Sequence, residues 1–115
     1  MRILVVEDHD DSRQVLLKLL RHWGYEVTAA DCMREALKLI NDAKFDVLVS
    51  DLGLPDGDGT DLVGEVKMRQ PLMKIVALTG RESETDRQRG REAGFDSYLT
   101  KPIDFQELRS VLGSP

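Results

Sequence analysis

The amino-acid sequence predicts an α/β fold in which a parallel sheet of five strands carries helices on both faces. Five short, mainly apolar runs recur along the 115 residues, and each is followed by a helical pattern or composition. Strict alternation of strand and helix is typical of a parallel sheet that is wound by helices on both sides. Two of the runs contain no polar residue, which indicates strands that are buried on both faces. The expected strands are residues 3–6, 25–30, 45–50, 75–78 and 96–100.

Capping residues and the spacing of apolar residues delimit the first three predicted helices. The first helix follows Asp10 and Asp11 and ends at Gly24, a residue that is common at helix C-termini. Asp31 is the expected N-cap of the second helix, and the third helix is expected over residues 59–70. The apolar stripe of the first helix is expected to consist of Val15, Leu16, Leu19, Leu20 and Trp23.

The last two predicted helices differ in how firmly they can be anchored. Residues 82–93 look helical by composition, but they offer the core only Ala93 and the small Gly90. A buried Leu contributes roughly 1.5–3 kcal/mol, so we expect this helix to be the least ordered element of the fold. Residues 105–112 carry apolar residues at helical spacing and form the last helix. Residues 113–115 are interpreted as the start of a linker or as an artificial end of the domain.

Composition and charge exclude several classes of protein. The length fits a single domain over residues 1–115. The net charge of -5 argues against direct binding to nucleic acid. The single cysteine, Cys32, allows no intrachain disulfide. No apolar stretch is long enough to span a membrane, and the N-terminus shows no signal-peptide pattern. We therefore expect a cytoplasmic domain without membrane contact.

Charged and hydroxyl side chains follow the predicted strands at their carboxyl ends. Because these ends meet at one edge of a parallel sheet, we expect the side chains to share one crevice. They are Glu7, Asp8, Asp51, Thr79 and Lys101. Oxygen-only ligands with no histidine or cysteine nearby favour a hard cation such as Mg²⁺. The Lys and Thr suit the oxygens of a phosphoryl group, and Asp51 can act as a nucleophile that forms an aspartyl-phosphate.

These residues carry a resemblance to a known family. Along essentially its whole length the chain resembles the receiver domain of two-component response regulators. The matching features are the Glu7-Asp8 pair, Asp51 followed by Leu54-Pro55 and Gly59, Thr79 in ALTG, and the run Tyr98-Leu99-Thr100-Lys101-Pro102. The resemblance implies a flavodoxin-like sheet with strand order 2-1-3-4-5, an order for which the general rule on such sheets names a chemotaxis member of this family.

The resemblance also implies a function and roles for individual residues. Asp51 would accept a phosphoryl group from the phosphohistidine of a histidine kinase or phosphotransfer domain, with Mg²⁺ as cofactor. Asp8, Asp51 and the backbone carbonyl of Gly53 would bind the ion, and Glu7 would reach it through water. Thr79 and Lys101 would bind the phosphoryl oxygens.

Further residues are implied to control the switch and its lifetime. Thr79 would draw Tyr98 inward on activation and change the face formed by the fourth helix, the fifth strand and the fifth helix. Lys101-Pro102 resembles the family's cis peptide bond. Gly53 and Arg81 occupy the two positions that influence phosphate lifetime, and we expect slow self-dephosphorylation. Such a protein is a signalling domain that catalyses its own phosphorylation and dephosphorylation, not an enzyme with a separate substrate.

Parts of the sequence also fit three other functions. The run Asp8-His9-Asp10-Asp11-Ser12 resembles the nucleophile motif of haloacid-dehalogenase-type phosphatases, which would make Asp8 the nucleophile. A module of the same fold that is not phosphorylated is a second alternative. Residues 54–65 partly fit a calcium-binding loop, but Leu54 stands where its first Asp is required, so this interpretation is rejected.

The remaining candidates carry no predicted role. His9 and His22 are interpreted as isolated surface residues, and Cys32 as incidental.

The chain is expected to be either a free-standing regulator or a receiver from a longer protein such as a hybrid histidine kinase. The run DLGLPDGDG favours the hybrid kinase by resemblance. A linked or separate output domain would be the downstream partner of this receiver domain.

Overall fold

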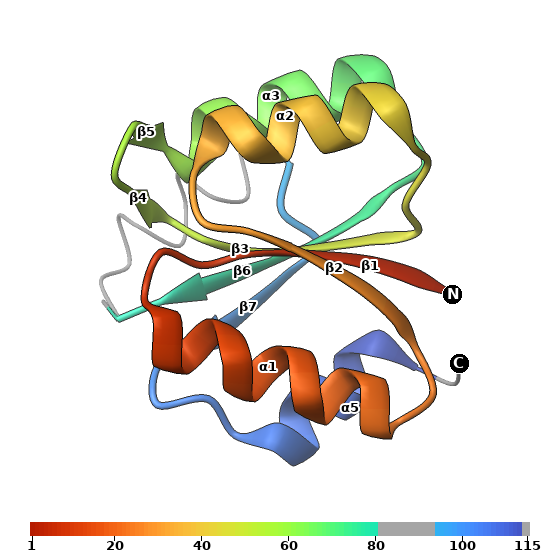
Figure 1. Ribbon diagram of the computed structural model, residues 1–115, viewed down its shortest axis with the longest axis vertical. Helices are drawn as coiled ribbons and strands as arrows, with labels where there is room; N and C mark the ends of the chain where they lie inside the picture. Colours follow the sequence, from red (N-terminus) through yellow and green to blue (C-terminus); the bar gives the residue numbers. More distant parts are fainter. Residues whose placement is uncertain (81–93, 114–115) are drawn as a thin grey trace.

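A parallel five-stranded sheet forms the centre of the computed structural model, which describes residues 1–80 and 94–113 (Figure 1). The sheet order is β2-β1-β3-β6-β7, and all four pairings are parallel. Counted along the chain, these strands stand in the order 2-1-3-4-5, so the predicted fold is confirmed. The strands are β1 (Arg2–Val6), β2 (Glu26–Ala30), β3 (Val47–Asp51), β6 (Lys74–Thr79) and β7 (Ser97–Thr100).

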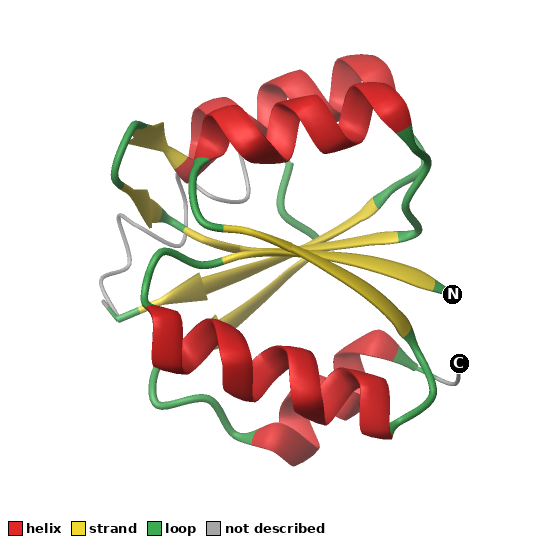
Figure 2. Cartoon of the chain, viewed as in Figure 1, coloured by secondary structure: helices red, strands yellow, loops and turns green. Residues whose placement is uncertain are grey.

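The described helices lie on both sides of the sheet, as Figure 2 shows. They are α1 (Asp10–His22), α2 (Met33–Asp42), α3 (Gly59–Arg69) and α5 (Phe105–Leu112). α1 and α5 cover one face, and α2 and α3 cover the other. None of the described helices is long and apolar enough to cross a membrane.

Two hydrophobic cores follow from the alternation of side chains along each strand. In β1, Ile3 and Val5 belong to the core that also contains residues of α1 and α5, whereas Leu4 and Val6 belong to the core shared with α2 and α3. Successive side chains of a strand point to opposite faces, so a continuous apolar run supplies both cores at once. This is why the central strands show no polar alternation in the sequence.

The carboxyl ends of the central strands meet at one edge of the molecule. Val6 is in register with Ser50, and Asp51 is in register with Leu78 on β6. In Figure 1 this edge lies on the left, opposite the N-terminus. The residues at the carboxyl ends of β1, β3 and β6 therefore lie at one edge of the sheet, as the sequence predicts.

The start of α2 differs from the prediction. The sequence favours Asp31 as the N-cap, but Cys32 occupies that position and its side chain makes no capping hydrogen bond. The carboxylate of Asp56 takes this role: Oδ1 accepts from the backbone N–H of Met33 at 2.8 Å, and Oδ2 accepts from that of Arg34 at 3.0 Å. The prediction was wrong because the cap comes from a distant loop.

That loop is a small hairpin that the sequence did not predict. It pairs β4 (Gly53–Leu54) with β5 (Gly57–Asp58) in antiparallel register. The hairpin lies against the first turn of α2, and a Cβ atom at Gly57 would stand only 2.3 Å from Cε of Met33. Glycine at this position leaves room for the end of the flexible Met33 side chain.

Two further expectations concern the helices. Gly24 adopts a φ of 96° after Trp23, the C-cap residue of α1, which agrees with its predicted role in ending that helix. Val15, which the periodicity places in the buried stripe of the same helix, is instead 50% exposed. The helix predicted over residues 82–93, with its expected low order, lies outside the described residues.

Candidate metal centre

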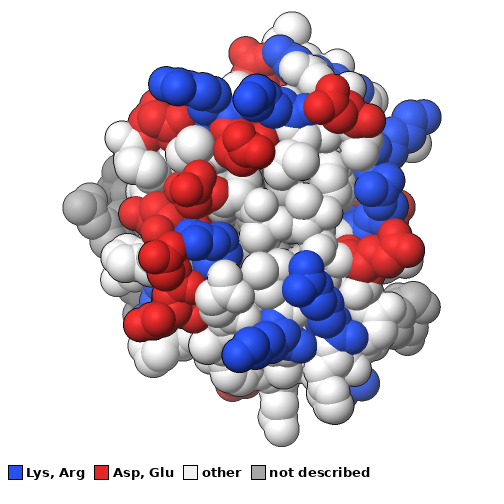
Figure 3. Space-filling view, viewed as in Figure 1, with Lys and Arg blue, Asp and Glu red and all other residues white. Residues whose placement is uncertain are grey.

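Three carboxylates converge at the carboxyl edge of the sheet. Glu7 and Asp8 follow β1, and Asp51 is the last residue of the adjacent strand β3. One donor atom from each of these residues, and one from His9, all lie within 4.8 Å of one another. Figure 3 shows acidic side chains gathered over this edge of the molecule, on the left of the view. The grouping of carboxylates expected from the sequence is therefore present in the fold.

Lys101 bridges two of these carboxylates. Its Nζ donates to Oδ2 of Asp51 at 2.8 Å and to Oε2 of Glu7 at 2.8 Å. The side chain of Glu7 is fully buried, and that of Asp51 is 12% exposed. Burial acts to lower the pKa of Lys101, but the hydrogen bonds and charges of Asp51 and Glu7 outweigh it, so this pKa lies above its usual value. Lys101 therefore remains a cation in contact with Asp51.

The end of β7 places Lys101 in this position. The backbone N–H of Lys101 donates to the carbonyl oxygen of Thr79 at 2.7 Å, which continues the parallel pairing past Thr100. The peptide bond between Lys101 and Pro102 is cis. From its position just after β7, a strand two positions away from β3 in the sheet order, the lysine side chain reaches Glu7 and Asp51.

The donor set at this edge fits a divalent cation. Oδ1 of Asp8 is buried and accepts no hydrogen bond within the described part of the chain. Three carboxylates and one ammonium group leave an excess of about two negative charges, which a divalent ion would neutralise. Carboxylate oxygens are ligands that Mg²⁺ prefers. The residues present therefore fit the ion that the sequence predicts.

His9 belongs to this centre, which sequence reasoning missed. Its Nδ1 lies 3.0 Å from Oε1 of Glu7 and 3.4 Å from Oδ1 of Asp8, although the side chain is 72% exposed. The hydrogen bond to Glu7, followed by the charges of Asp8 and Glu7, raises the pKa of His9 above its usual value. The interpretation of His9 as an isolated residue was wrong. Its place directly after the Glu7-Asp8 pair was the available signal.

The other sequence-predicted residues lie around the centre at different depths. Thr79 is the last residue of β6 and is buried. Gly53 donates its backbone N–H to Oδ1 of Asp51 at 3.2 Å. Tyr98 is half-buried on β7, and its ring makes an edge-to-face contact with Phe95 at a centroid distance of 5.7 Å. Arg81 lies outside the described residues.

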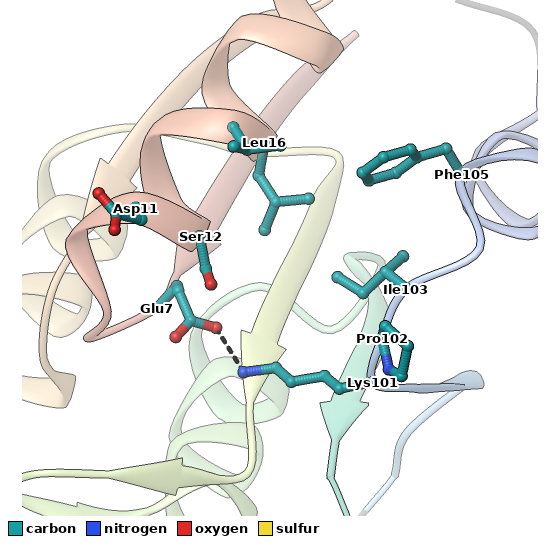
Figure 4. Close-up of a pocket in the computed structure, with 9 residues that line it drawn as sticks. Glu7, Asp11, Ser12, Leu16, Lys101, Pro102, Ile103 and Phe105 are labelled. Carbon is teal, nitrogen blue, oxygen red and sulfur yellow. Dashed lines mark hydrogen bonds and ion pairs between the residues drawn. The ribbon is translucent and has the colours of Figure 1, made fainter.

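A cavity of about 360 Å³ opens beside Lys101, between α1 and the segment that connects β7 to α5 (Figure 4). The hydrogen-bonded pair of Glu7 and Lys101 lies at one end, and mainly apolar side chains line the rest. The exposed Val15 is one of them, so part of the apolar stripe of α1 faces this cavity instead of the core. The lining residues are Glu7, Asp11, Ser12, Val15, Leu16, Lys101, Pro102, Ile103 and Phe105.

Response regulator proteins are among the solved structures that share this fold. The chain superposes on the chemotaxis protein CheY4 of Vibrio cholerae with a TM-score of 0.91 and 34% sequence identity, covering 96% of this chain and 94% of CheY4. It superposes on the response regulator TrrA of Thermotoga maritima, solved in complex with Mg²⁺ and BeF, with a TM-score of 0.86 and 31% identity. That match covers 96% of this chain and 95% of TrrA.

Sequence relatives of the chain differ in length. The chain is 41% identical over 110 residues to an uncharacterized 14.6 kDa protein of Leptolyngbya boryana, covering 94% of this chain and 84% of that protein. It is 36% identical over 110 residues to the transcriptional regulatory protein PmrA of Pectobacterium parmentieri, covering 96% of this chain. It spans about half the length of PmrA and of similar transcriptional regulators, between 45% and 50%.

Nearly the whole chain also matches one family model. The model of the response regulator receiver domain covers residues 3–113. The match agrees with the sheet order, with the grouping of Glu7, Asp8, Asp51 and Lys101, and with the solved structures. It offers no support for the phosphatase alternative. The chain belongs to the response regulator receiver domain family.

Proposed function

We propose that this receiver domain accepts a phosphoryl group on Asp51 from the phosphohistidine of a histidine kinase or phosphotransfer domain, in a reaction that depends on Mg²⁺. The observation that carries this proposal is the contact of Lys101 Nζ with Asp51 Oδ2, beside Oδ1 of Asp8, which has no hydrogen-bond partner among the described residues. Asp51 thereby stands between a fixed cation and a group of oxygens suited to a metal ion.

The residues around Asp51 support the chemistry of phosphoryl transfer. A carboxylate oxygen of Asp51 attacks phosphorus, and the bond from phosphorus to the histidine nitrogen breaks, so that the imidazole leaves with the bonding electrons. Lys101 donates a hydrogen bond to Asp51 before the attack and then binds a phosphoryl oxygen. The hydroxyl of Thr79 is proposed to bind a second oxygen.

Asp8, Asp51 and the backbone carbonyl of Gly53 are the proposed ligands of Mg²⁺, with Glu7 acting through water. When bound, the ion neutralises the charge that the phosphoryl oxygens and the carboxylates would otherwise concentrate in one place. The N–H of Gly53 already donates to Asp51, so the loop after β3 is held next to the nucleophile.

The switch and the partners follow from family membership and stay proposals. Thr79 on β6 and Tyr98 on β7 are the proposed switch residues, and these two strands are adjacent in the sheet. The transcriptional regulators that match are about twice as long as this chain, which supports a linked or separate output domain as the downstream partner. A single receiver domain over residues 1–115 is proposed from family membership, and a hybrid-kinase origin from the run DLGLPDGDG.

Phosphorylation at Asp51 can be tested directly. The protein is incubated with acetyl phosphate and Mg²⁺, and the modified residue is located by mass spectrometry. Phosphate is expected on Asp51, and none in the Asp51→Asn variant or after chelation of the metal. Asp42→Asn, at the exposed end of α2, is a control that should retain full incorporation. Phosphate on Asp8, persisting in Asp51→Asn, would instead support the phosphatase alternative.

The lifetime of the phosphorylated state is a separate prediction. Gly53 has no side chain to orient a water molecule, so slow self-dephosphorylation is expected. The space around Gly53 is open, because a Cβ atom added to this residue would meet no other atom within 4 Å, so Gly53→Asn can be accommodated. This variant should lose phosphate several-fold faster than wild type, measured as decay of the labelled protein. A wild-type half-life of seconds with Mg²⁺ alone would contradict the prediction.

A further inference from the structure

The guanidinium group of Arg13 connects helix α1 to the end of strand β1. Its Nη1 donates a hydrogen bond to the backbone carbonyl oxygen of Glu7 at 3.0 Å, and its Nη2 donates to Oδ1 of Asp10. The side chain of Arg13 is only 16% exposed, although it carries a charge. A planar guanidinium has donors in fixed directions, so it can hold two acceptors in one arrangement. Arg13 therefore bridges the backbone at the end of β1 and the first turn of α1.

The backbone of Glu7 is held on both of its sides. Its N–H donates to the carbonyl oxygen of Ala30 on β2 at 3.1 Å, which continues the sheet one residue past Val6. Its carbonyl oxygen is the one that accepts from Arg13. This oxygen belongs to the peptide unit that joins Glu7 to Asp8, and a peptide unit is planar. Fixing the oxygen therefore fixes the direction in which the chain continues into Asp8.

The charge of Arg13 does not explain its place beside the acidic centre. Lys101 already supplies a cation to Glu7 and Asp51, and the charge of Arg13 is paired with that of Asp10. An additional cation near a site for a divalent ion repels that ion and weakens its binding. By charge alone, removal of Arg13 would strengthen the binding of Mg²⁺. A role in holding the peptide unit predicts the opposite sign.

We infer that Arg13 is a positioning residue of the metal centre. It holds the peptide unit between Glu7 and Asp8, so that the carboxylate of Asp8 stays beside those of Glu7 and Asp51. Arg13 acts through the backbone of Glu7 and is not itself a ligand of the ion. The inference rests on the proposed function, because it assigns a role in the Mg²⁺ site of that function.

Two arginine variants on the same helix test this role. Arg13→Met removes the charge and the donors and keeps a flexible side chain that can fill the same space. Arg21→Met is the matched control, because Nη2 of Arg21 donates to the backbone carbonyl oxygen of Val27 at 3.3 Å. The control thus loses the same charge and the same kind of contact to a strand, at the other end of α1. The Kd of Mg²⁺ is measured by calorimetry, well below the melting temperature of each protein.

The Kd of Mg²⁺ for Arg13→Met is expected to rise roughly 10-fold, as is typical when a residue that orients metal ligands is removed. The Kd for Arg21→Met should equal that of the parent protein. A Kd for Arg13→Met that equals the parent value or lies below it would overturn the inference, because charge would then be the only effect of Arg13. An equal rise in Arg21→Met would overturn it as well.

Phosphorylation by acetyl phosphate gives a second readout that loss of folded protein would not reproduce. In Arg13→Met the Mg²⁺ concentration for half-maximal rate should rise in step with the Kd, whereas the rate at saturating Mg²⁺ should match that of the parent protein. A lower maximal rate at an unchanged Mg²⁺ requirement would contradict a positioning role. The proposed function is judged on the parent protein alone, and it fails if that protein neither binds Mg²⁺ nor becomes phosphorylated. A parent protein that does both, with Arg13→Met unchanged, sinks only the inference about Arg13.

Discussion

Among single residues, those of the acidic centre are charged at positions where the fold itself requires no charge. Glu7 is fully buried and depends on Lys101 for its compensating charge. Asp8 adds a buried oxygen without a hydrogen-bond partner among the described residues, next to two other carboxylates. Buried like charges and unpartnered oxygens are destabilising unless something offsets them. A local arrangement that opposes stability in this way is typical of a functional site.

Removing the charge of Asp8 should therefore stabilise the metal-free protein. We expect Asp8→Asn to raise the free energy of unfolding by about 1 kcal/mol, because it relieves repulsion and gives the position a hydrogen-bond donor. The measurement is urea denaturation in the presence of a chelator. Asp42→Asn should leave stability within experimental error of wild type. A loss of stability in Asp8→Asn would show that Asp8 is already compensated without a metal.

Among the helices and strands, Asp56 joins two segments that the sheet does not connect. Its carboxylate caps α2 from the turn between β4 and β5, through hydrogen bonds from the N–H groups of Met33 and Arg34. Gly53, whose N–H donates to Asp51, is a residue of the same hairpin. The cap therefore ties the loop that follows the proposed phosphoacceptor to a helix outside the sheet.

The pKa of Asp56 gives this cap a pH dependence. The backbone hydrogen bonds from Arg34 and Met33 lower the pKa of Asp56 below its usual value near 3.8. A depressed pKa means that the contribution to stability is present above the usual value and is lost as the pH falls through the folded-state value. As the pH falls, the loss of this cap should accelerate amide exchange at Met33 and Arg34 only when Asp56 becomes protonated. An NMR titration follows both the exchange of these amides and the protonation of Asp56.

The Asp56→Ala substitution tests the same capping role by removing the carboxylate. It should accelerate exchange of these two amides at neutral pH and lower the melting temperature by a few degrees, because a capping side chain is lost. Asp42→Ala, at the other end of α2, serves as the control. Unchanged exchange at Met33 and Arg34 would contradict the capping role.

In the molecule as a whole, the sheet brings together residues that are distant in the chain. Lys101 and Glu7 are separated by 94 positions, and Lys101 and Asp51 by 50. Their contacts exist only when β1, β3, β6 and β7 are assembled in the observed order. An ion that binds this centre therefore binds the folded state and stabilises the whole domain.

Magnesium should measurably stabilise the protein. At a Mg²⁺ concentration ten times its Kd, the free energy of unfolding should increase by about 1.4 kcal/mol, provided that the unfolded chain does not bind the ion. Thermal denaturation with and without a chelator measures the effect. Asp8→Asn should reduce or abolish it, which links the stabilisation to the acidic centre. No change in the wild-type melting temperature at millimolar Mg²⁺ would contradict a magnesium site.

Local sequence patterns were enough to predict the fold and the position of the centre. The periodicity of apolar residues is a local property, so it indicated the five strands of the sheet and α1, α2, α3 and α5 without any knowledge of their partners. Parallel strands share one carboxyl edge, so the residues that end them could be placed together. The strand order and the roles of individual residues came from the resemblance to the receiver family. The family match confirms this resemblance for the domain, and the residue roles stay proposals.

Which side chains actually meet is a property of the folded chain alone. Asp56 caps a helix that begins 23 residues earlier in the chain, and no local pattern indicates such a contact. The exposure of Val15 depends on where the segment after β7 runs, because that segment leaves a cavity beside α1. His9 looked isolated in the sequence, but the turn after β1 directs its ring nitrogen to Glu7 and Asp8. These contacts depend on loop paths and side-chain rotamers, which packing between distant segments sets and hydrophobic periodicity does not encode.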